Sequence, residues 1–242
     1  MSKTLLFLLA ASFAALLAVS CFDSDDDEDL PGSNLTGSGD SSSSEEASSS
    51  SAGVVYGESV DYGGETYQTV VIGSQTWFAR NLNYDAEGSR CYNDLESNCD
   101  IYGRLYDWET ALAVCPSGWH LPGEEEWDEL ILYVDSTYNT NISQSFIASE
   151  YLRTIDGWNN NSIYNSTDKY GFSALPGGRG LSDGSFSIVG VFGFWWSATE
   201  SDFKSDYALC RVMGVRFFGE PLNDDGEGCP KFSYASIRCL KN

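Results

Sequence analysis

The segment Cys115-Pro116-Ser117-Gly118-Trp119-His120-Leu121-Pro122 lies between two predicted helices. Before it, apolar residues recur at three- and four-residue steps and predict a helix over residues 107–115, which the Pro-Ser-Gly sequence ends. After it, Pro122-Gly123 starts a second helix with three glutamates in its first turn, where the helix dipole favours acids. One face of this helix carries Trp127, Leu130, Ile131 and Val134. We therefore expect both helices to pack on a sheet.

Short runs of β-branched and aromatic residues flank the two helices and predict strands. Before the helices, these runs cover residues 54–56, 67–72 and 76–79. After the helices, they cover residues 171–175, 192–199, 207–212, 215–218 and 234–240. Residues 139–169 predict an irregular segment with one short helix near Glu150. The order predicts an α+β fold of short, twisted antiparallel strands with two helices, in one domain over residues 54–242.

The N-terminal region predicts export. Residues 4–20 carry no charge and are rich in Leu, Ala and Phe, which is typical of a signal peptide over residues 1–20. The apolar run is shorter than the roughly 20 residues of a membrane-spanning helix, which is the alternative. Leu17-Ala18-Val19-Ser20-Cys21 resembles a bacterial lipobox, so we expect acylation of Cys21 and a membrane anchor. The other interpretation is an ordinary signal peptide followed by a cysteine.

Residues 21–53 predict a tether behind the acylated cysteine. Six acids between positions 23 and 29 form a run too charged to fold. This run is either a plain solvated spacer or an export signal like that of some Gram-negative lipoproteins. Residues 33–51 are mainly Ser, Gly, Asp and Glu and predict a flexible linker. We therefore expect an outer-membrane lipoprotein whose domain is exposed at the cell surface.

The charge of the chain argues against polyanionic partners. Without the nine acids that precede position 53 and without Lys3, the domain keeps 27 acidic and 12 basic residues, a net charge near −15. Such a charge repels nucleic acids and anionic lipid surfaces. We therefore expect no nucleic-acid partner.

Six cysteines besides Cys21 predict disulfides, because an even number in an exported chain usually pairs. They are Cys91, Cys99, Cys115, Cys210, Cys229 and Cys239. None shows the C-x-x-C spacing of a zinc site. Cys91 and Cys99 bracket a short loop and are expected to bridge locally, which leaves the pairing of the other four open.

Several segments resemble one family, the Fibrobacter succinogenes major paralogous domain of bacterial surface proteins. They are Thr69–Trp77 with Asn81-Leu82, Tyr102–Trp108, Cys115–Pro122 with Glu126-Trp127, Gly171–Gly178, Trp195–Glu200 and Ile237–Cys239. The resemblance covers roughly residues 55–242, although Phe78-Ala79-Arg80 departs from its usual pattern. The Trp-His-Leu-Pro turn is also similar to C-type lectins and formylglycine-generating enzymes, which share a looped, disulfide-closed fold. That analogy implies the pairs Cys115 with Cys239 and Cys210 with Cys229.

No residue is assigned a catalytic role, and no cofactor is expected. A formylglycine-generating enzyme needs two free cysteines near the end of the chain, whereas Cys229 and Cys239 have expected disulfide partners. His120 is the only histidine, and we expect a buried, hydrogen-bonded structural role for it. A carboxylate pair for glycoside hydrolysis is the alternative, but its separation does not follow from sequence.

Two ligand sites are nevertheless considered. Five oxygen-bearing side chains of the kind that calcium prefers lie close together in the sequence. They are Glu220, Asn223, Asp224, Asp225 and Glu227. They loosely resemble the calcium ligands of sugar-binding C-type lectins, but Leu222 breaks that pattern, and a solvated acidic loop is the alternative.

The second site uses tryptophan faces on which sugar rings can stack. Trp158, Trp195 and Trp196 are the candidates, with core packing as the alternative. Trp195 and Trp196 adjoin in a predicted strand, so alternation points one inward and one outward. We therefore expect a lipid-anchored, noncatalytic binding or adhesion module for plant polysaccharide or a surface protein. A carbohydrate-active hydrolase and a structural surface-coat protein are the alternatives.

Overall fold

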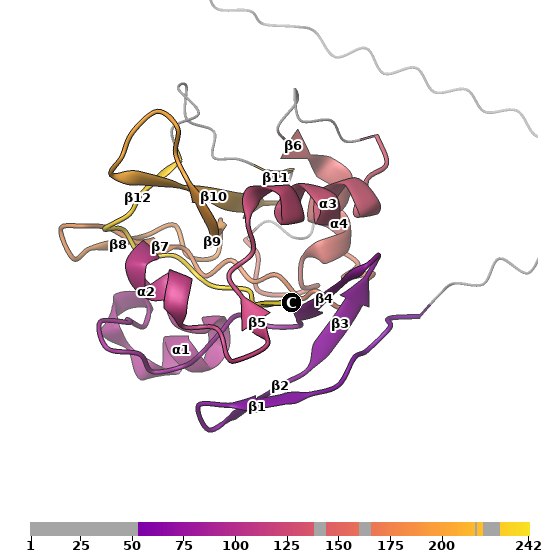
Figure 1. Cartoon of the computed structure of the whole chain (residues 1–242), viewed down its shortest axis with the longest axis horizontal. Helices are drawn as coiled ribbons and strands as arrows, with labels where there is room; N and C mark the ends of the chain where they lie inside the picture. Colours follow the sequence, from indigo (N-terminus) through magenta and orange to yellow (C-terminus); the bar gives the residue numbers. More distant parts are fainter. Residues whose placement is uncertain (1–52, 138–143, 160–165, 216, 220–227) are drawn as a thin grey trace, which may run out of the picture. The chain divides into compact units, whose positions relative to one another are not determined.

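The computed structural model describes residues 53–137, 144–159, 166–215, 217–219 and 228–242 (Figure 1). Within these residues the chain is a mixed α and β structure with several antiparallel sheets, four α-helices and three disulfides. Residues 49–242 form one compact unit. No helix of the described part is long and apolar enough to cross a membrane.

The first sheet joins early strands of the domain to its last one. Its order is β3 (Thr69–Ile72), β4 (Gln75–Phe78), β13 (Leu240–Lys241) and β5 (Trp119–His120). Leu240 pairs with Trp77 on one side and with His120 on the other, so β13 lies inside the sheet (Figure 1). The β3–β4 turn contains Gly73 at a φ of 63°, a left-handed conformation that favours glycine.

The second sheet is built on the two longest strands, β9 (Gly193–Glu200) and β10 (Tyr207–Gly214), which pair antiparallel. β10 also pairs with β12 (Cys229–Pro230) and β11 (Phe217–Gly219), and β11 pairs with β6 (Gln144–Ser145). Two separate hairpins complete the strands. They are β1 (Val60–Tyr62) with β2 (Glu65–Tyr67), and β7 (Arg179–Gly180) with β8 (Phe186–Ser187).

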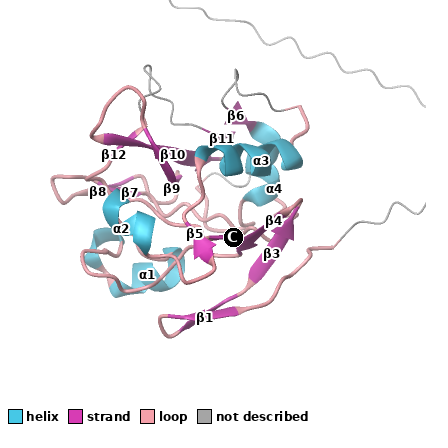
Figure 2. Ribbon diagram, viewed as in Figure 1, coloured by secondary structure: helices cyan, strands magenta, loops and turns pink. Residues whose placement is uncertain are grey.

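The helices lie in two groups, α1 (Glu96–Tyr102) with α2 (Trp108–Ala113), and α3 (Glu124–Val134) with α4 (Phe146–Leu152) (Figure 2). The two helices expected around the Pro-Ser-Gly segment are α2 and α3, and the short helix expected near Glu150 is α4. The count of two was wrong, because α1 and a 3-10 helix, η1 (Tyr92–Asp94), occupy the segment that was expected to be a loop.

Local hydrogen bonds explain where the helices begin. The Asp107 carboxylate accepts from the Thr110 N–H at 2.9 Å, and the Ser145 hydroxyl accepts from the Ala148 N–H at 2.9 Å. At α3, the Glu126 carboxylate reaches back to the Gly123 N–H at 2.7 Å. α2, α3 and α4 therefore each start where a polar side chain satisfies an end group that has no partner within the helix, whereas α1 has no such side chain at its N-cap, Leu95.

β9 separates two hydrophobic clusters and is covered on both faces. Trp195 belongs to the cluster that contains Trp77, Trp127 and Phe218. Trp196 belongs to the other cluster, around Tyr106 and the end of α2. The two tryptophans therefore point to opposite faces as alternation requires, but neither face of the strand is open to solvent.

Three disulfides join cysteines that lie 8, 124 and 19 residues apart in the sequence. Cys91 pairs with Cys99, Cys115 with Cys239, and Cys210 with Cys229. These are the local bridge that spacing predicted and the two bridges that the lectin analogy implied. The Cys115–Cys239 bridge connects the segment after α2 to the segment before β13, across 124 residues.

A fully buried arginine, Arg238, organises the polar interior. Its guanidinium donates to the carbonyl oxygens of Phe78 and Phe172 and to Asn81 Oδ1, and it lies 4.2 Å from the Phe172 ring centroid. Burial lowers the pKa of Arg238 to about 9, so the group stays charged at neutral pH. Asn81 Oδ1 also accepts from Trp195 Nε1 at 2.8 Å. One amide thus links the arginine to β9.

Some expected strands are reduced to single bridges. Within residues 54–56 only Tyr56 forms a bridge, with Val70, and within residues 171–175 only Ala174 does, with Arg153. Residues 234–236 form bridges with residues 180, 106 and 195 before β13 begins. These segments are extended, but each contacts a neighbouring strand too briefly to form a continuous ladder.

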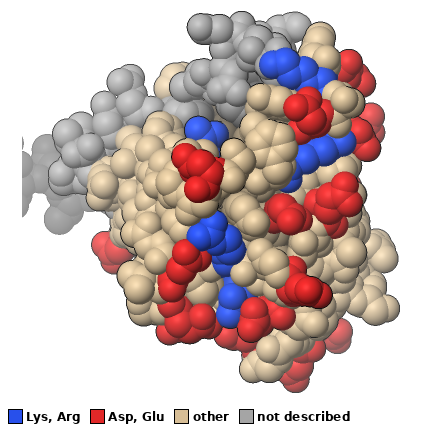
Figure 3. All heavy atoms as spheres, turned by 90° about the vertical axis from the view of Figure 1, so that its left-hand side faces the viewer, with Lys and Arg blue, Asp and Glu red and all other residues tan. Residues whose placement is uncertain are grey.

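Several bases at the surface are paired with acids. Arg90 meets Asp94 at 2.6 Å, and Lys231 meets Glu200 at 2.8 Å. Figure 3, which turns the left side of Figure 1 toward the reader, shows Lys and Arg side chains interleaved with Asp and Glu side chains. This face therefore presents no continuous basic surface.

Candidate functional site

The three tryptophans predicted to contact a ligand are buried, so that prediction is wrong. Trp195 and Trp196 are 0% exposed and Trp158 is 4% exposed. All three indole N–H groups have partners inside the domain, and Trp158 Nε1 donates to the Ala174 carbonyl at 3.1 Å. Trp195 Nε1 donates to Asn81 Oδ1 at 2.8 Å, and Trp196 Nε1 donates to the Tyr106 carbonyl at 2.7 Å. These rings pack the core, and no sugar can stack on them.

Two other predicted sites lie outside the described residues. One is the acylation site Cys21, and the other is the group of expected calcium ligands. The members of that group are Glu220, Asn223, Asp224, Asp225 and Glu227. Acylation and calcium binding stay predictions.

His120 has the hydrogen-bonded role expected of it, although it is half-exposed rather than buried. Its Nε2 lies 2.9 and 3.0 Å from the two carboxylate oxygens of Glu126, and its Nδ1 lies 2.7 Å from Asn242 Oδ1. A carboxylate only accepts, so Nε2 carries a proton. Because both ring nitrogens are engaged, the arrangement joins β5 to α3 and to Asn242 and leaves no nitrogen directed at a substrate.

Cys91, Glu96 and Cys99 bring three potential metal ligands within 4.8 Å of one another. Metal binding by cysteine requires the thiolate, whereas these two sulfurs are joined in a disulfide. Glu96 also pairs with Arg104 at 3.0 Å. The group is therefore a bridge with a neighbouring ion pair, and it offers no metal site in its oxidised form.

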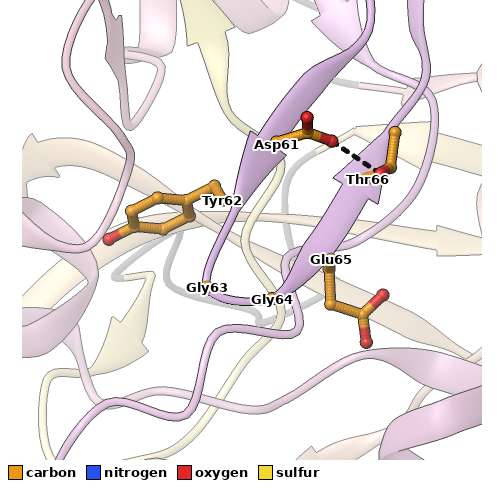
Figure 4. A pocket seen from close by; sticks show the side chains of 6 residues that line it. All are labelled: Asp61, Tyr62, Gly63, Gly64, Glu65 and Thr66. Atoms are coloured by element: carbon orange, nitrogen blue, oxygen red, sulfur yellow. Dashed lines mark hydrogen bonds between the residues drawn. The ribbon is translucent and has the colours of Figure 1, made fainter.

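A hollow of about 330 Å³ lies at the β1–β2 turn and is lined by residues 61–66 (Figure 4). Its polar side chains have partners, since Thr66 Oγ1 donates to Asp61 at 2.6 Å and Glu65 accepts from Arg80 and Asn83. The Arg80 hydrogen bond lowers the pKa of Glu65, so this carboxylate is ionised at neutral pH. Tyr62 and Glu65 point away from each other in Figure 4. These side chains do not converge on a ligand.

Three tyrosines and a lysine form a cluster at the surface, which we call the tyrosine patch. Tyr133 is 55% exposed, whereas Tyr151 and Tyr170 are partly buried against the core. Tyr170 lies 6.0 Å from Tyr133 and 6.4 Å from Tyr151, measured between ring centroids. Lys169 Nζ lies 4.7 Å from the Tyr151 ring and 5.4 Å from the Tyr170 ring. α3, α4 and the segment that follows α4 thus each contribute an aromatic ring to one surface.

The β3–β4 turn supports one end of the tyrosine patch. A Cβ atom on Gly73 would lie 2.8 Å from the Tyr133 ring, so the ring covers this glycine closely. Ser74 donates to the carboxylate of Glu129, which lies one helical turn before Tyr133 on α3. Tyr133 is nevertheless 55% exposed, so much of its ring stays available.

The tyrosine patch combines apolar and hydrogen-bonding groups. Its aromatic rings offer apolar faces, while the phenol hydroxyls and the Lys169 ammonium group offer hydrogen bonds. Neighbouring rings are inclined by 64° and 60°, so their faces turn in different directions. The patch therefore presents ring faces and polar groups in more than one direction.

Comparison with known proteins decides the family. A family model of the Fibrobacter succinogenes major domain matches residues 70–241. The chain belongs to this family. No curated protein and no solved structure matches it.

The tyrosine patch of this Fibrobacter succinogenes major domain was missed in the sequence. Tyr133 directly precedes the buried Val134 on α3, but it lies off the apolar face, which is the signal that it is exposed. Tyr151 and Tyr170 fall in or beside the segment without clear periodicity. Nothing in their spacing shows that they approach Tyr133.

Proposed function

We propose that this Fibrobacter succinogenes major domain protein is a lipid-anchored, noncatalytic binding module at the outer surface of the cell. The tyrosine patch carries the proposal, because it brings the 55% exposed ring of Tyr133 together with two partly buried rings and with polar groups beside them. The ligand is plant polysaccharide, since the family resemblance points to fibre-degrading bacteria. A neutral polymer suits a domain whose net charge is near −15.

The N-terminal sequence supports the proposed location at the outer surface of the cell. Residues 17–21 resemble a lipobox, and the charged and Ser-rich residues behind Cys21 suit a tether. A multiply acylated cysteine would anchor the chain, because stable anchoring needs more than one acyl chain. Replacing Cys21 with serine is expected to release the protein from the membrane fraction, and unchanged retention would contradict the anchor.

The lectin-like character of the fold is also a proposal. It is supported by the Cys115–Cys239 bridge, which closes the domain from the segment after α2 to its last strand. The Cys210–Cys229 bridge within the second sheet supports it as well. A noncatalytic role is supported by His120, whose two ring nitrogens both have partners.

A retention assay tests the binding function. Residues 49–242, with disulfides intact, are mixed with insoluble cellulose, xylan or pectin, with calcium or with a chelator, and the bound fraction is measured. We expect saturable retention without release of sugars. Y133A should weaken retention roughly tenfold, as for a central aromatic residue of an interface.

F203A is the matched control, because Phe203 is a 76% exposed aromatic residue in the β9–β10 connection. Its retention should equal that of the wild type. Equal losses in Y133A and F203A would contradict the tyrosine patch as the site. Released sugars would indicate a hydrolase, whereas no retention on any polymer would favour a surface coat. Loss of retention with chelator would implicate the acidic loop.

A further inference from the structure

Arginines in this domain are almost always matched to oxygen atoms. The pairs are Arg80 with Glu65, Arg90 with Asp94, Arg104 with Glu96, Arg153 with the Ser149 carbonyl, Arg211 with Asp128, and Arg238 with the Phe78 carbonyl. Among the described residues Arg179 is the exception. No hydrogen bond or ion pair reaches its guanidinium, and its buried Nε has no acceptor.

Arg179 is held in place by its packing. It lies on β7, directly opposite Ser187 of β8, so the two side chains share one face of the hairpin. Its guanidinium carbon is 5.0 Å from the centroid of the buried Phe194 ring, and Phe192 packs against that ring at 6.5 Å. The guanidinium group of Arg179 thus lies against an apolar surface.

This position is costly for a charge. Burial lowers the pKa of Arg179, and no neighbouring carboxylate opposes the effect. An apolar side chain of similar length would cover Phe194 without losing hydration of a charge. Arg179 is only half-buried, and its two terminal amino groups keep contact with solvent. A ligand can therefore reach the donors that the protein leaves unused.

We infer that Arg179, with the Ser187 hydroxyl on the same face, binds a single carboxylate group of a sugar acid. A guanidinium presents two parallel N–H donors that match the two oxygens of a carboxylate, and the hydroxyl can add a third hydrogen bond. The ligand carries one charge rather than many, because bases and acids are interleaved on this face (Figure 3) and the domain is acidic overall.

The carboxylate site is separate from the tyrosine patch. The β7–β8 hairpin lies at the left of the domain in Figure 1, whereas α3 and α4 lie at the upper right. The inference therefore goes beyond the proposed function, and loss of one site leaves the other intact.

The test compares D-glucuronate with D-glucose, which differ by a carboxylate in place of a hydroxymethyl group. The full chain is labelled with ¹⁵N in its arginines, and the side-chain Nε–H signals are followed during titration with each sugar. We expect a saturable shift of the Arg179 signal with glucuronate only. R179Q should weaken glucuronate binding by about tenfold or more, since charge-assisted hydrogen bonds are lost.

K241Q is the matched control, because Lys241 is an exposed base of β13 whose loss changes the net charge equally. Its affinity for glucuronate should stay within about twofold of the wild type, as expected for a distant exposed charge. Equal losses in R179Q and K241Q, equal responses to glucose and glucuronate, or no response at all would each overturn the inference.

R179M separates a ligand role from a structural one. Methionine can cover Phe194 without a charge, so the variant should unfold at the wild-type temperature or above it while glucuronate binding is lost. A clearly lower unfolding temperature would show that the guanidinium is kept for stability and would overturn the inference.

Discussion

Arg238 and Arg179 both place a guanidinium over a phenylalanine ring, at 4.2 and 5.0 Å from the ring centroid. Their polar surroundings differ. Arg238 is 0% exposed, and its hydrogen bonds go to carbonyl and amide oxygens from two distant segments of the chain. Arg179 is half-buried and has neither a hydrogen bond nor an ion pair in the described structure.

The difference indicates that the guanidinium of Arg238 stabilises the fold, whereas the guanidinium of Arg179 contributes little to its stability. A buried ion is tolerated where oxygens replace its water, and removing it then leaves those oxygens without partners. Arg238 fits this description, because it connects Phe78 at the end of β4 and the nearby Asn81 with Phe172. Replacing Arg179 leaves no protein oxygen without a hydrogen-bond donor. The two sites should therefore respond to mutation in opposite ways.

The largest effect is expected from R238M. The substitution leaves several buried oxygens without a donor and should lower the free energy of unfolding by about 3–5 kcal/mol. Denaturation with urea, monitored by tryptophan fluorescence, measures this loss. A loss below about 1 kcal/mol, the size of an ordinary surface effect, would remove the contrast with Arg179.

The next effect is expected from N81A. The Asn81 amide oxygen accepts from Trp195 Nε1 and from Arg238 Nη2, so both donors lose their acceptor, and we expect a loss of about 2–3 kcal/mol. Urea denaturation of N81A, R238M and the double variant measures the coupling. The double variant should lose less than the sum, because the two residues share one hydrogen bond. Strict additivity would argue against a connected interior.

A pH-dependent effect is expected at Asp168, which interacts with Arg238 across Ser173. Burial raises the pKa of Asp168 above its ordinary value of 3.8, against smaller lowering effects of Ser173 and Arg238. Its contribution to stability is therefore complete below pH 3.8 and is lost as the pH rises through the raised pKa.

D168N cannot titrate at this position, so it isolates the effect. The free energy of unfolding of the wild type minus that of D168N should fall as the pH rises above about 4, as measured by urea denaturation from about pH 3 to pH 7. A difference that is flat across this range would show that the carboxyl has the same pKa in the folded and unfolded chains.

The smallest effect is expected from R179K. Lysine keeps the charge but loses the planar fork, and no protein oxygen depends on that fork, so the unfolding free energy should stay within about 0.5 kcal/mol of the wild type. R238K, with the same chemical change, should cost several times more. Similar losses in the two variants would erase the distinction between the sites.

Local sequence patterns were enough to predict the helices and strands whose apolar residues recur at a regular spacing. α3 was predicted from its apolar face, and Trp127, Leu130, Ile131 and Val134 are all buried. Strands β9 and β10 lie close to the predicted residues 192–199 and 207–212. The cysteine spacing and the lectin analogy together gave the three disulfides.

Features that depend on distant segments did not follow from the sequence. Alternation correctly placed Trp195 and Trp196 on opposite faces of β9, but only the packing of other segments on both faces buries them. Trp119 and His120 form a strand because β13 pairs with them, and that pairing has no local signal. The tyrosine patch needs three segments to meet, and Arg179 is unusual only in what is missing around it.

The place of β13 between β4 and β5 has a consequence for how the domain is made. Synthesis delivers β4 and β5 early, but the strand that fills the gap between them arrives more than a hundred residues after β5. Until then one edge of β4 has no partner strand, and Cys115 has no cysteine with which to form its disulfide. The domain therefore cannot complete its first sheet or its longest-range disulfide before its last residues have been synthesised.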